Sequence, residues 1–378
     1  MRRASILEDE SDFESAFQDE EQHGARAGSL STKRLSEIEA KPVSWLWPGR
    51  IARGKLNIIA GNPGLGKSQI TASIAAVITT GGRWPVDRHS SQVGEVFFLT
   101  AEDDAADTLR PRLEAAGADV SRIHIVEGVV SGYTGDGTPM NKSFSLAEDL
   151  EVLSQKLYVM PNVAALVIDP ISAYLGDTDS HRNADVRRVL APLSELAARH
   201  NLAIIGISHL TKTAGEQAIM RVSGSLAFVA AARTAYLVAQ DQNDAARRLF
   251  VPLKNNLARD GTGLAYRIEG VNVPSLAGKI ETSRIVWEPD PVTISADDAM
   301  QPLPPQKASA LADAKEWLGE ILAEGQSLAA KELFALAEEQ DFSRQTLRRA
   351  AASLRIKPKK QGKAGPWVWS LPAEDAQA

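Results

Sequence analysis

Residues 61–68 read Gly61-Asn62-Pro63-Gly64-Leu65-Gly66-Lys67-Ser68, which is a complete GxxxxGKS phosphate-binding loop. An apolar run at 56–60 precedes the loop, and a helical pattern that begins with Gln69 follows it. The glycines allow backbone N–H groups to point at phosphate oxygens, while Lys67 reaches the β- and γ-phosphates and the Ser68 hydroxyl binds Mg²⁺. The loop therefore predicts a strand–loop–helix site in which residues 61–69 bind a nucleoside triphosphate with Mg²⁺.

Length and composition limit the class of protein. The chain has 378 residues, of which 44% are hydrophobic and 24% charged, enough for one large core and a small additional domain. It contains no Cys, which excludes disulfides, thiolate catalysis and Cys-ligated zinc and fits a reducing compartment. No apolar run has the length of a membrane span, and acidic residues follow the first three residues where a signal peptide would have its apolar core. We expect a globular cytoplasmic protein that does not bind membranes.

Negative charge is concentrated at the start of the chain. The formal net charge is −6, and residues 1–22 alone hold eight acidic and two basic residues, so the rest of the chain is close to neutral. Residues 1–36 combine these acids with Ser, Gln and Gly and with few large apolar side chains. Such a segment buries too little apolar surface to offset the entropy lost on ordering. We therefore expect a disordered acidic tail over 1–36, and a second short tail at 373–378.

Strand and helix patterns alternate after residue 42. Apolar β-rich runs occur at 56–60, 95–100, 123–127, 164–169 and 202–208, with helical patterns at 67–80, 104–117, 146–159 and 184–200. This alternation predicts a mostly parallel sheet covered by helices. Four more strand patterns without long helices, at 234–239, 248–252, 265–271 and 284–288, predict an antiparallel extension. We expect one α/β domain over 37–290 and a linker over 291–307, where Pro, Asp and Ser are frequent.

Two of the predicted strands end in carboxylates. Asp169 ends the apolar run at 164–169, and because the carboxyl ends of parallel strands meet at one edge, we expect it beside the loop as a Mg²⁺ ligand. Glu102 follows the strand at 95–100 and is the candidate general base that orients and deprotonates the attacking water. Asp103 and Asp104 in the same run are more typical of helix N-caps.

Several motifs, taken in order, resemble those of one ATPase family. The segments GNPGLGKS, FFLTAEDD, LVIDPISAYLGD, IIGISHLTK and RVSGSLAFVAAARTAYLV occur within residues 42–290. Their order resembles the RecA-like AAA ATPases of plasmids, phages and integrated elements, close to RepA-type hexameric replicative helicases and related to the DnaB-type motor. The resemblance implies a RecA-like P-loop core, ATP with Mg²⁺, a hexameric homo-oligomer and action on DNA. It supports Glu102 as the catalytic base and implies that His209 senses the γ-phosphate.

Two basic residues have a role only between subunits if the resemblance holds. The RepA-like pattern places an arginine finger at Arg233, which would stabilise charge on the γ-phosphate of a neighbouring subunit. Lys254 corresponds to the lysine that DnaB-like motors present to the neighbour's nucleotide. The chain departs from the DnaB pattern because Asn256 stands where an arginine is usual, and this favours Arg233 as the finger. An ordinary surface cation at a strand end is the alternative for both residues.

Two loops are candidates for a DNA path through a ring. RecA-like rings place a pore loop at the position of residues 210–224, where Lys212 and Arg221 could contact phosphates. The segment 177–183, which contains Arg182, resembles the other inner loop. Long polar loops are often only solvated, and this stays the alternative.

Residues 308–372 have a pattern of their own. Helical patterns at 312–322, from 327 and from 343 precede two strands around a turn, an order that resembles a winged helix-turn-helix. Residues 343–363 contain no acid and eight cations, which favours contact with DNA phosphates: Arg344, Arg348, Arg349, Arg355, Lys357, Lys359, Lys360 and Lys363. Docking to an acidic partner, including the chain's own tail, is the alternative. Trp367 and Trp369 share one side of a strand, and we expect both to pack in the core rather than to stack on bases.

Together these patterns favour an ATP-driven ring motor, a replicative-type helicase or translocase that moves on single-stranded DNA and carries a winged-helix appendage for duplex or single-stranded DNA. A DNA-binding regulator or loader whose assembly is switched by ATP stays open as a different class. A small-molecule kinase is a third reading, although it would have no use for a basic appendage or for cations between subunits.

Overall fold

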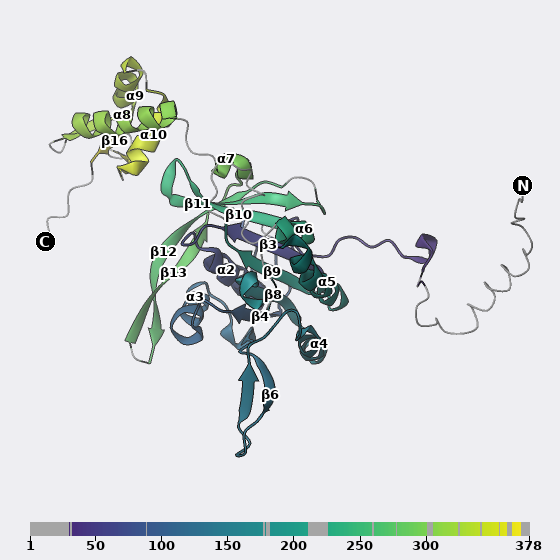
Figure 1. Cartoon of the computed structure of the whole chain (residues 1–378). Coiled ribbons are helices and arrows are strands. Elements are labelled where there is room, and N and C mark those ends of the chain that lie inside the picture. Colours follow the sequence, from purple (N-terminus) through teal and green to yellow (C-terminus); the bar gives the residue numbers. More distant parts are fainter. Residues whose placement is uncertain are drawn as a thin grey trace, which may run out of the picture. The chain divides into compact units, whose positions relative to one another are not determined.

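A computed structural model describes most of the chain (Figure 1). The described residues are 30, 32–87, 89–176, 178, 182–210, 226–258, 261–276, 278–300, 305–323, 326–340, 342–354, 356–360 and 365–371. The chain divides into two units, residues 1–42 and 43–378. The first unit contains one short 3₁₀ helix among its described residues, Leu35–Glu37. The tail predicted over 1–36 lies mostly outside the described residues.

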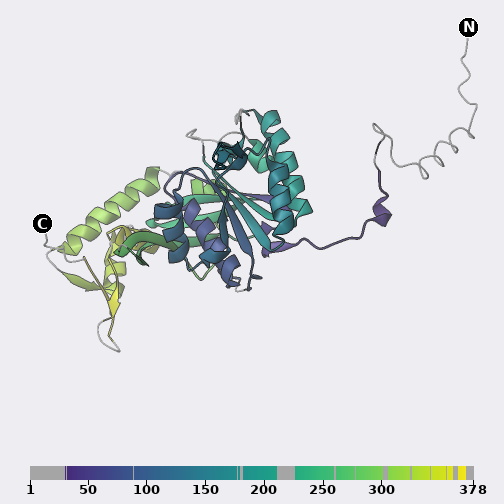
Figure 2. The same ribbon diagram turned by 90° about the horizontal axis from the view of Figure 1, so that it is seen from below.

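A nine-stranded sheet forms the centre of the second unit, in the spatial order β13-β12-β11-β10-β3-β9-β8-β4-β5. Six strands pair in parallel: β10 (Thr234–Asp241), β3 (Lys55–Gly61), β9 (Ala203–Ser208), β8 (Val163–Asp169), β4 (Glu95–Thr100) and β5 (Ile123–Ile125). Helices cover both faces of this parallel part (Figure 2). The predicted α/β core with a mostly parallel sheet is confirmed.

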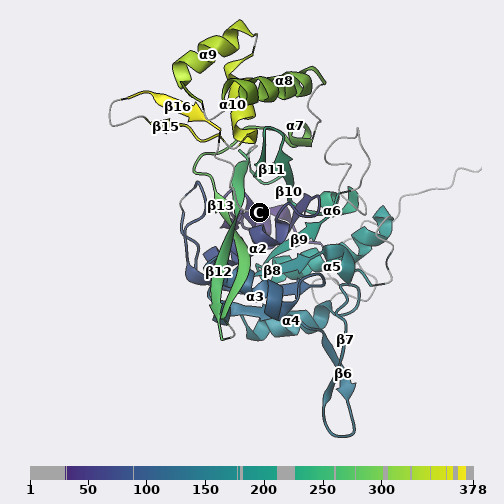
Figure 3. The ribbon, with the colours of Figure 1, turned by 90° about the vertical axis from the view of Figure 1, so that its left-hand side faces the viewer.

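Three antiparallel strands extend the sheet beyond β10. They are β11 (Asp244–Asn255), β12 (Leu264–Ser275) and β13 (Gly278–Trp287). β12 and β13 form a long hairpin at one edge of the sheet (Figure 3). Three of the four strands predicted for the antiparallel extension are therefore confirmed, and they are longer than the sequence pattern predicts. The first, at 234–239, is β10, which pairs in parallel with β3, and only its other side begins the extension.

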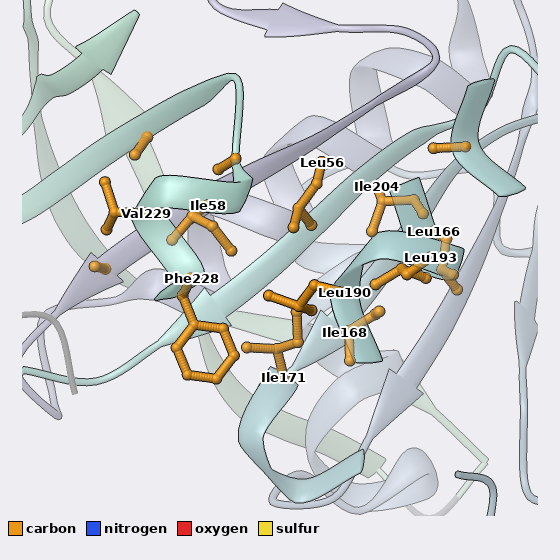
Figure 4. Packing of buried hydrophobic residues seen from close by; sticks show 14 of the residues in the cluster. Leu56, Ile58, Leu166, Ile168, Ile171, Leu190, Leu193, Ile204, Phe228 and Val229 are labelled. Atoms are coloured by element: carbon orange, nitrogen blue, oxygen red, sulfur yellow. The ribbon is translucent and has the colours of Figure 1, made fainter. Parts of the chain in front are cut away.

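The core consists of two apolar clusters, one on each face of the sheet. Helices α2 (Lys67–Thr80) and α3 (Arg110–Ala115) contribute to one cluster. The other contains α4 (Leu150–Val159), α5 (Asn183–Arg199) and α6 (Leu226–Ala231), and Figure 4 shows Leu190 of α5 and Phe228 of α6 within it. Successive residues of β3 divide between the clusters, because Ile58 belongs to one and Ile59 to the other. Burial on both faces explains why the parallel strands are continuous apolar runs in the sequence.

Some elements between β4 and α4 differ from the predicted ones. The helix expected at 104–117 consists of a π-helical turn, Ala105–Leu109, followed by α3, because Pro111 lacks the N–H that would continue the α-helical pattern. A projecting hairpin of β6 (Val129–Tyr133) and β7 (Pro139–Lys142) was not predicted, since its Gly and Thr content resembles a loop (Figure 3). The helix expected from 146 begins only at Leu150.

The segment that the sequence predicts as a linker contains a helix. α7 (Ala296–Met300) places Ala296 and Ala299 in the same apolar cluster as α5. The next helix, α8 (Pro305–Ile321), also begins before residue 308. The chain therefore stays packed on the α/β core to at least residue 300. No helix in the described part of the chain is long and apolar enough to cross a membrane.

Residues after 305 form a separate apolar cluster with contributions from every helix of this region, including Leu318, Leu333, Leu347 and Trp369. The elements are α8, β14 (Ser327–Ala329), α9 (Ala330–Glu339), α10 (Arg344–Ser353), β15 (Lys359–Lys360) and β16 (Trp367–Ser370). Three helices and a hairpin are present in the predicted order. Residues 327–329 were expected to begin the second helix, but they form β14 because Leu328 pairs with Trp369 across a three-stranded sheet.

The two tryptophans of β16 have different environments. Trp369 is 4% exposed and packs edge-to-face on Phe334, with ring centroids 5.5 Å apart. Trp367 is 54% exposed. The expectation that both rings pack in the core is therefore wrong for Trp367, because the residue opposite it on the sheet is Lys360 rather than an apolar side chain.

Candidate nucleotide site

The phosphate-binding loop connects β3 to α2 and depends on two glycines with positive φ. Gly64 has φ +76° and Gly66 has φ +89°, a backbone conformation that only glycine adopts at little cost. A Cβ on Gly66 would also lie 2.9 Å from Cδ1 of Ile268 on β12. The loop ends at the N-terminus of α2, where free N–H groups and the helix dipole favour a phosphate.

Lys67 is buried at the base of this loop, with its ammonium group turned toward backbone oxygens. Its Nζ donates to the carbonyls of Gly61 at 2.9 Å and Asn62 at 3.0 Å. A third contact joins Nζ to Nδ1 of His209 at 3.3 Å. Burial lowers the pKa of Lys67, while the charges of Asp169 and Glu102 act in the opposite direction. The cation is thus held where the β- and γ-phosphates of a nucleotide would bind.

Ser68 and Asp169 form a pair of oxygen ligands at the end of β8. The Ser68 hydroxyl donates to Oδ2 of Asp169 at 2.7 Å. Burial raises the pKa of Asp169, the hydrogen bond from Ser68 lowers it, and the charges of Asp103 and Glu102 raise it further. Among the described residues no group of three or more His, Cys, Asp or Glu side chains could hold a metal ion. A hydroxyl and a carboxylate are oxygen donors of the kind that binds Mg²⁺ together with substrate phosphates, so the donor chemistry of the pair fits the predicted site.

Glu102 and His209 complete the site from two other strand ends. Glu102 follows β4 and His209 follows β9, and the strand order brings both beside the loop after β3. Nε2 of His209 lies 3.3 Å from Oε1 of Glu102. Because Lys67 donates to Nδ1, the imidazole can carry its proton on Nε2 and donate it to Glu102. The Glu102 side chain is 56% exposed, so water can reach the carboxylate, as the predicted role of general base requires.

The structure adds residues that the sequence analysis missed. A cavity of about 290 Å³ is lined by the phosphate-binding loop, Glu102, Asp169 and His209, and also by Arg112, Ile268 and Ser283. Arg112 of α3 donates to Asp103 within this cavity. No local motif marks these positions, because Arg112 is one of two arginines on its helix and Ile268 and Ser283 come from the distant β12–β13 hairpin.

The β12–β13 hairpin also holds the loop by hydrogen bonds. The hydroxyl of Tyr266 donates to the carbonyl of Leu65 at 2.7 Å, and Nε2 of Gln69 donates to Oγ of Ser283 at 2.8 Å. These pairs are separated by 201 and 214 residues in the chain. The antiparallel extension therefore supports the nucleotide site rather than only widening the sheet.

Arg233 lies beside the start of β3, whereas the phosphate-binding loop follows the end of that strand. Thr234 pairs with Asn57 near the start of β3, whereas Val238 pairs with Gly61 at its end. Four residues of strand separate these positions by about 13 Å. The Arg233 side chain is exposed, and its backbone N–H donates to Leu56 at 3.0 Å. Arg233 is thus firmly placed but too far away to contact a nucleotide in its own loop.

Lys254 has a contact within its own chain that the sequence did not indicate. Its Nζ donates to the carbonyls of Val229 at 2.8 Å, Ala230 at 3.0 Å and Ala232 at 2.8 Å. These oxygens lie at the C-terminal end of α6, where carbonyls lack helical partners. Burial lowers the pKa of Lys254, and the nearby charge of Arg233 lowers it further. Any contact with a neighbour's nucleotide would have to replace these bonds.

Some of the candidate DNA contacts belong to the described residues and others do not. Lys212, Arg221, Arg355 and Lys363 lie outside the described residues. Arg182 is exposed and pairs with Asp185 at 3.3 Å.

In the C-terminal region most of the predicted contacts are exposed: Arg344, Arg348, Lys357, Lys359 and Lys360. Arg349 differs, because its Nε and Nη2 atoms are buried and have no partner in the part of the chain described. The residue as a whole is only half-buried, so contact between Arg349 and a DNA phosphate stays a prediction. Its position follows from the 3.6-residue period of α10, which turns Arg349 away from the side of Arg344 and Arg348.

Comparison with known proteins agrees with this geometry. Residues 21–215 match the family model of an AAA domain, which is about half of the chain, and the chain belongs to this family. The DNA repair protein RadA of Streptococcus pneumoniae (strain ATCC BAA-255 / R6) is 24% identical over 188 residues, which are 50% of this chain and 37% of RadA. The chain thus spans little more than a third of that relative. The protein has a RecA-like ATPase core, whereas a RepA-type or DnaB-type specialisation stays a prediction.

We expect Tyr266→Phe to weaken ATP binding more than it weakens the fold. Tyr266 is fully buried, and the substitution removes only the hydroxyl that holds the carbonyl of Leu65. One lost hydrogen bond is worth about 0.5–1.5 kcal/mol, so ATP affinity should fall roughly 2- to 10-fold. Titration with a fluorescent ATP analogue measures the affinity, and thermal unfolding reports the stability.

Tyr236→Phe is the matched control, because Tyr236 is also buried but its hydroxyl interacts with Arg50, away from the loop. It should lower stability without changing ATP affinity. Equal losses of affinity in both variants would show that Tyr266 supports only the fold.

Proposed function

We propose that this protein is an ATP-hydrolysing, ring-forming DNA translocase of the replicative helicase type. The observation that carries the proposal is the contact series from Lys67 through His209 to Glu102. It links the group that would hold the γ-phosphate to the carboxylate that would activate water. A site that only binds ATP as an assembly signal has no need of such a link.

The proposed reaction is the attack of water on the γ-phosphorus. The loop N–H groups and Lys67 bind the phosphates, and Ser68 with Asp169 would hold Mg²⁺, which neutralises charge between the β- and γ-phosphates. Glu102 takes a proton from the attacking water as the new P–O bond forms and the bond to the β–γ bridging oxygen breaks. When the γ-phosphate leaves, Lys67 loses the phosphate oxygens that it would bind, and its contact with His209 changes as a result. His209 is therefore suited to report the state of the nucleotide to the end of β9.

The position of Arg233 supports hydrolysis at subunit interfaces. It is an exposed cation whose backbone is held by hydrogen bonds at the end of the strands opposite its own loop. A neighbouring subunit in a ring would bring a second loop to such a cation, which would then stabilise the charge that develops on the γ-phosphate. Lys254 donates to carbonyls at the end of α6, just before Arg233, and would thereby hold the backbone that carries Arg233. Lys254 is also the second candidate for direct contact with the neighbour's nucleotide.

Action on DNA is supported by the C-terminal region and by the similarity to RadA, which is named a DNA repair protein. Helices α8, α9 and α10 with the sheet β14-β16-β15 are the elements of a winged helix-turn-helix, which we propose for residues 308–372. In the α/β core, Arg182, Lys212 and Arg221 are the proposed contacts to single-stranded DNA in the pore. The proposed assembly is a hexamer with ATP and Mg²⁺.

The test compares phosphate release by the full chain with no DNA, with single-stranded DNA and with duplex DNA, and then assays strand separation on a forked duplex. We expect single-stranded DNA to stimulate turnover and the fork to be separated only with hydrolysable ATP. Native mass measurements with and without nucleotide and DNA report ring formation. Assembly that responds to ATP without stimulated turnover or strand separation would instead identify a regulator or loader.

A further inference from the structure

The C-terminal region carries a tryptophan that its own core does not cover. Trp367 is the first residue of β16 and is 54% exposed, whereas Trp369 on the same face of the strand is 4% exposed. Within the described residues Trp369 packs on Phe334, and Trp367 has no ring contact. A single exposed aromatic side chain is common on protein surfaces, so Trp367 indicates a binding site only in combination with the groups around it.

The nearest neighbour of Trp367 on the sheet is a cation. Trp367 pairs with Lys360 across the antiparallel ladder of β15 and β16, so both side chains stand on the same face. Directly opposite residues have Cβ atoms about 5 Å apart. Trp367 and Lys360 therefore start from neighbouring positions on one face at the end of the sheet.

Two arginines continue this surface from the helices. Arg344 and Arg348 are one helical turn apart on α10, and the guanidinium group of each lies 5.6 Å from the centre of the Phe334 ring. Phe334 in turn contacts Trp369, the residue two positions after Trp367 on the same strand face. The buried Trp369 and its neighbour Phe334 thus lie between two groups of exposed side chains, Trp367 with Lys360 at the end of the sheet and the two arginines on α10.

Aromatic rings beside cations are the composition of a single-stranded DNA site, where bases stack on the rings and phosphates contact the cations. A base inside a duplex offers no free face for stacking, whereas an unpaired or terminal base does. An acidic protein partner would use the cations but would gain little from an isolated ring face. The combination of charges and ring thus favours unpaired DNA over the other ligands of a basic surface.

We infer that Trp367 stacks on an unpaired DNA base while Lys360, Arg344 and Arg348 contact the flanking phosphates. The inference rests on the proposed DNA binding of residues 308–372 and specifies its ligand as single-stranded DNA or the junction of a single strand with a duplex. The surface is separate from the proposed pore contacts in the α/β core.

The test uses the full chain without ATP and a labelled single-stranded oligonucleotide, with a covalently closed circular duplex as competitor. Stacking on one base is worth about 1–3 kcal/mol, so Trp367→Ala and Trp367→Leu should weaken single-strand binding roughly 5- to 150-fold. Trp367→Phe should keep most of the affinity, and competition by the closed duplex should not change. Tyr158→Ala, which removes an exposed aromatic from α4, is the matched control and should bind as the wild type does.

Two further measurements separate stacking from general DNA binding. An oligonucleotide with 5-iododeoxyuridine should form a photocrosslink to the peptide that contains Trp367, whatever other sites bind DNA. Replacing Arg344 and Arg348 by Gln should weaken binding and reduce the slope of log affinity against log salt by about 1.4, since each phosphate contact contributes about 0.7 with single strands.

The outcomes distinguish this inference from the function on which it rests. Normal binding by the Trp367 variants and no crosslink to Trp367 in the wild type, with weaker binding in the arginine variant, would overturn stacking and leave DNA binding intact. Normal affinity of Trp367→Leu with a loss in Trp367→Ala would show apolar contact instead of stacking. If neither the Trp367 variants nor the Arg344/Arg348 variant changes DNA binding, both the stacking site and DNA binding by this region are overturned.

Discussion

Glu102→Gln is expected to bind ATP as the wild type does and to hydrolyse it about 100- to 10,000-fold more slowly. Gln keeps the size of the side chain and can still contact Nε2 of His209, which lies 3.3 Å from the carboxylate. It cannot accept a proton from water, so the nucleotide stays bound and unhydrolysed. Equilibrium titration and phosphate release, measured on the same preparation, separate binding from turnover.

Asp103→Asn is the matched control, because this neighbouring carboxylate also lines the cavity but is engaged by Arg112. It should affect turnover much less than Glu102→Gln does. Lys67→Ala should instead abolish turnover through loss of phosphate binding, since Lys67 is the cation at the base of the loop. Normal hydrolysis by Glu102→Gln would show that the general base is another group.

Arg233→Ala is expected to lower turnover about 10³- to 10⁵-fold while each subunit still binds ATP, because an arginine finger acts on the transition state. Mixing this variant with Lys67→Ala should restore part of the activity. In such mixed rings, some interfaces combine an intact loop from one subunit with an intact Arg233 from its neighbour. Phosphate release across a series of mixing ratios, in rings of confirmed mass, measures the recovery.

Two control variants show whether position or charge matters. Arg187→Ala removes another exposed arginine, from α5, and should leave turnover unchanged. Lys254→Ala should lower the free energy of unfolding by about 1–3 kcal/mol, because it leaves carbonyls at the end of α6 without a donor. An absence of recovery in mixed rings would contradict the action of Arg233 on a neighbour.

The sequence was most informative where function needs a local backbone shape or a strand end. The phosphate-binding loop is specified by consecutive residues, and its strand and the bounds of α2, Lys67–Thr80, follow from the adjacent apolar patterns. Asp169, Glu102 and His209 are far apart in the chain, yet each follows a parallel strand. Since the carboxyl ends of parallel strands meet at the same end of a sheet, topology was enough to predict that Asp169 and Glu102 lie near the loop, whereas the role of His209 was implied only by the family resemblance.

Contacts across the sheet could not be predicted in this way. Tyr266 and Ser283 reach the loop because β12 and β13 continue the sheet past β10, and the sequence shows only apolar alternation at these positions. The sequence suggested a neighbour's nucleotide, or solvent, as the partner of Lys254, and it did not show that the register of β11 against β10 brings this side chain to the end of α6. The register depends on the packing of whole strands rather than on any single residue.

The RecA-like core, the loop and the acids around it could be predicted because they depend on local motifs and on strand direction, whereas His209 needed the family resemblance. The extent of each apolar core and the side chains that it leaves uncovered depend on packing between distant elements, which the sequence does not show. Trp367 and Trp369 show the difference, because their spacing predicts a shared face and nothing more. Burial depends on what packs against that face: Phe334 covers Trp369, whereas Lys360 is the neighbour of Trp367 and leaves its ring open to a ligand.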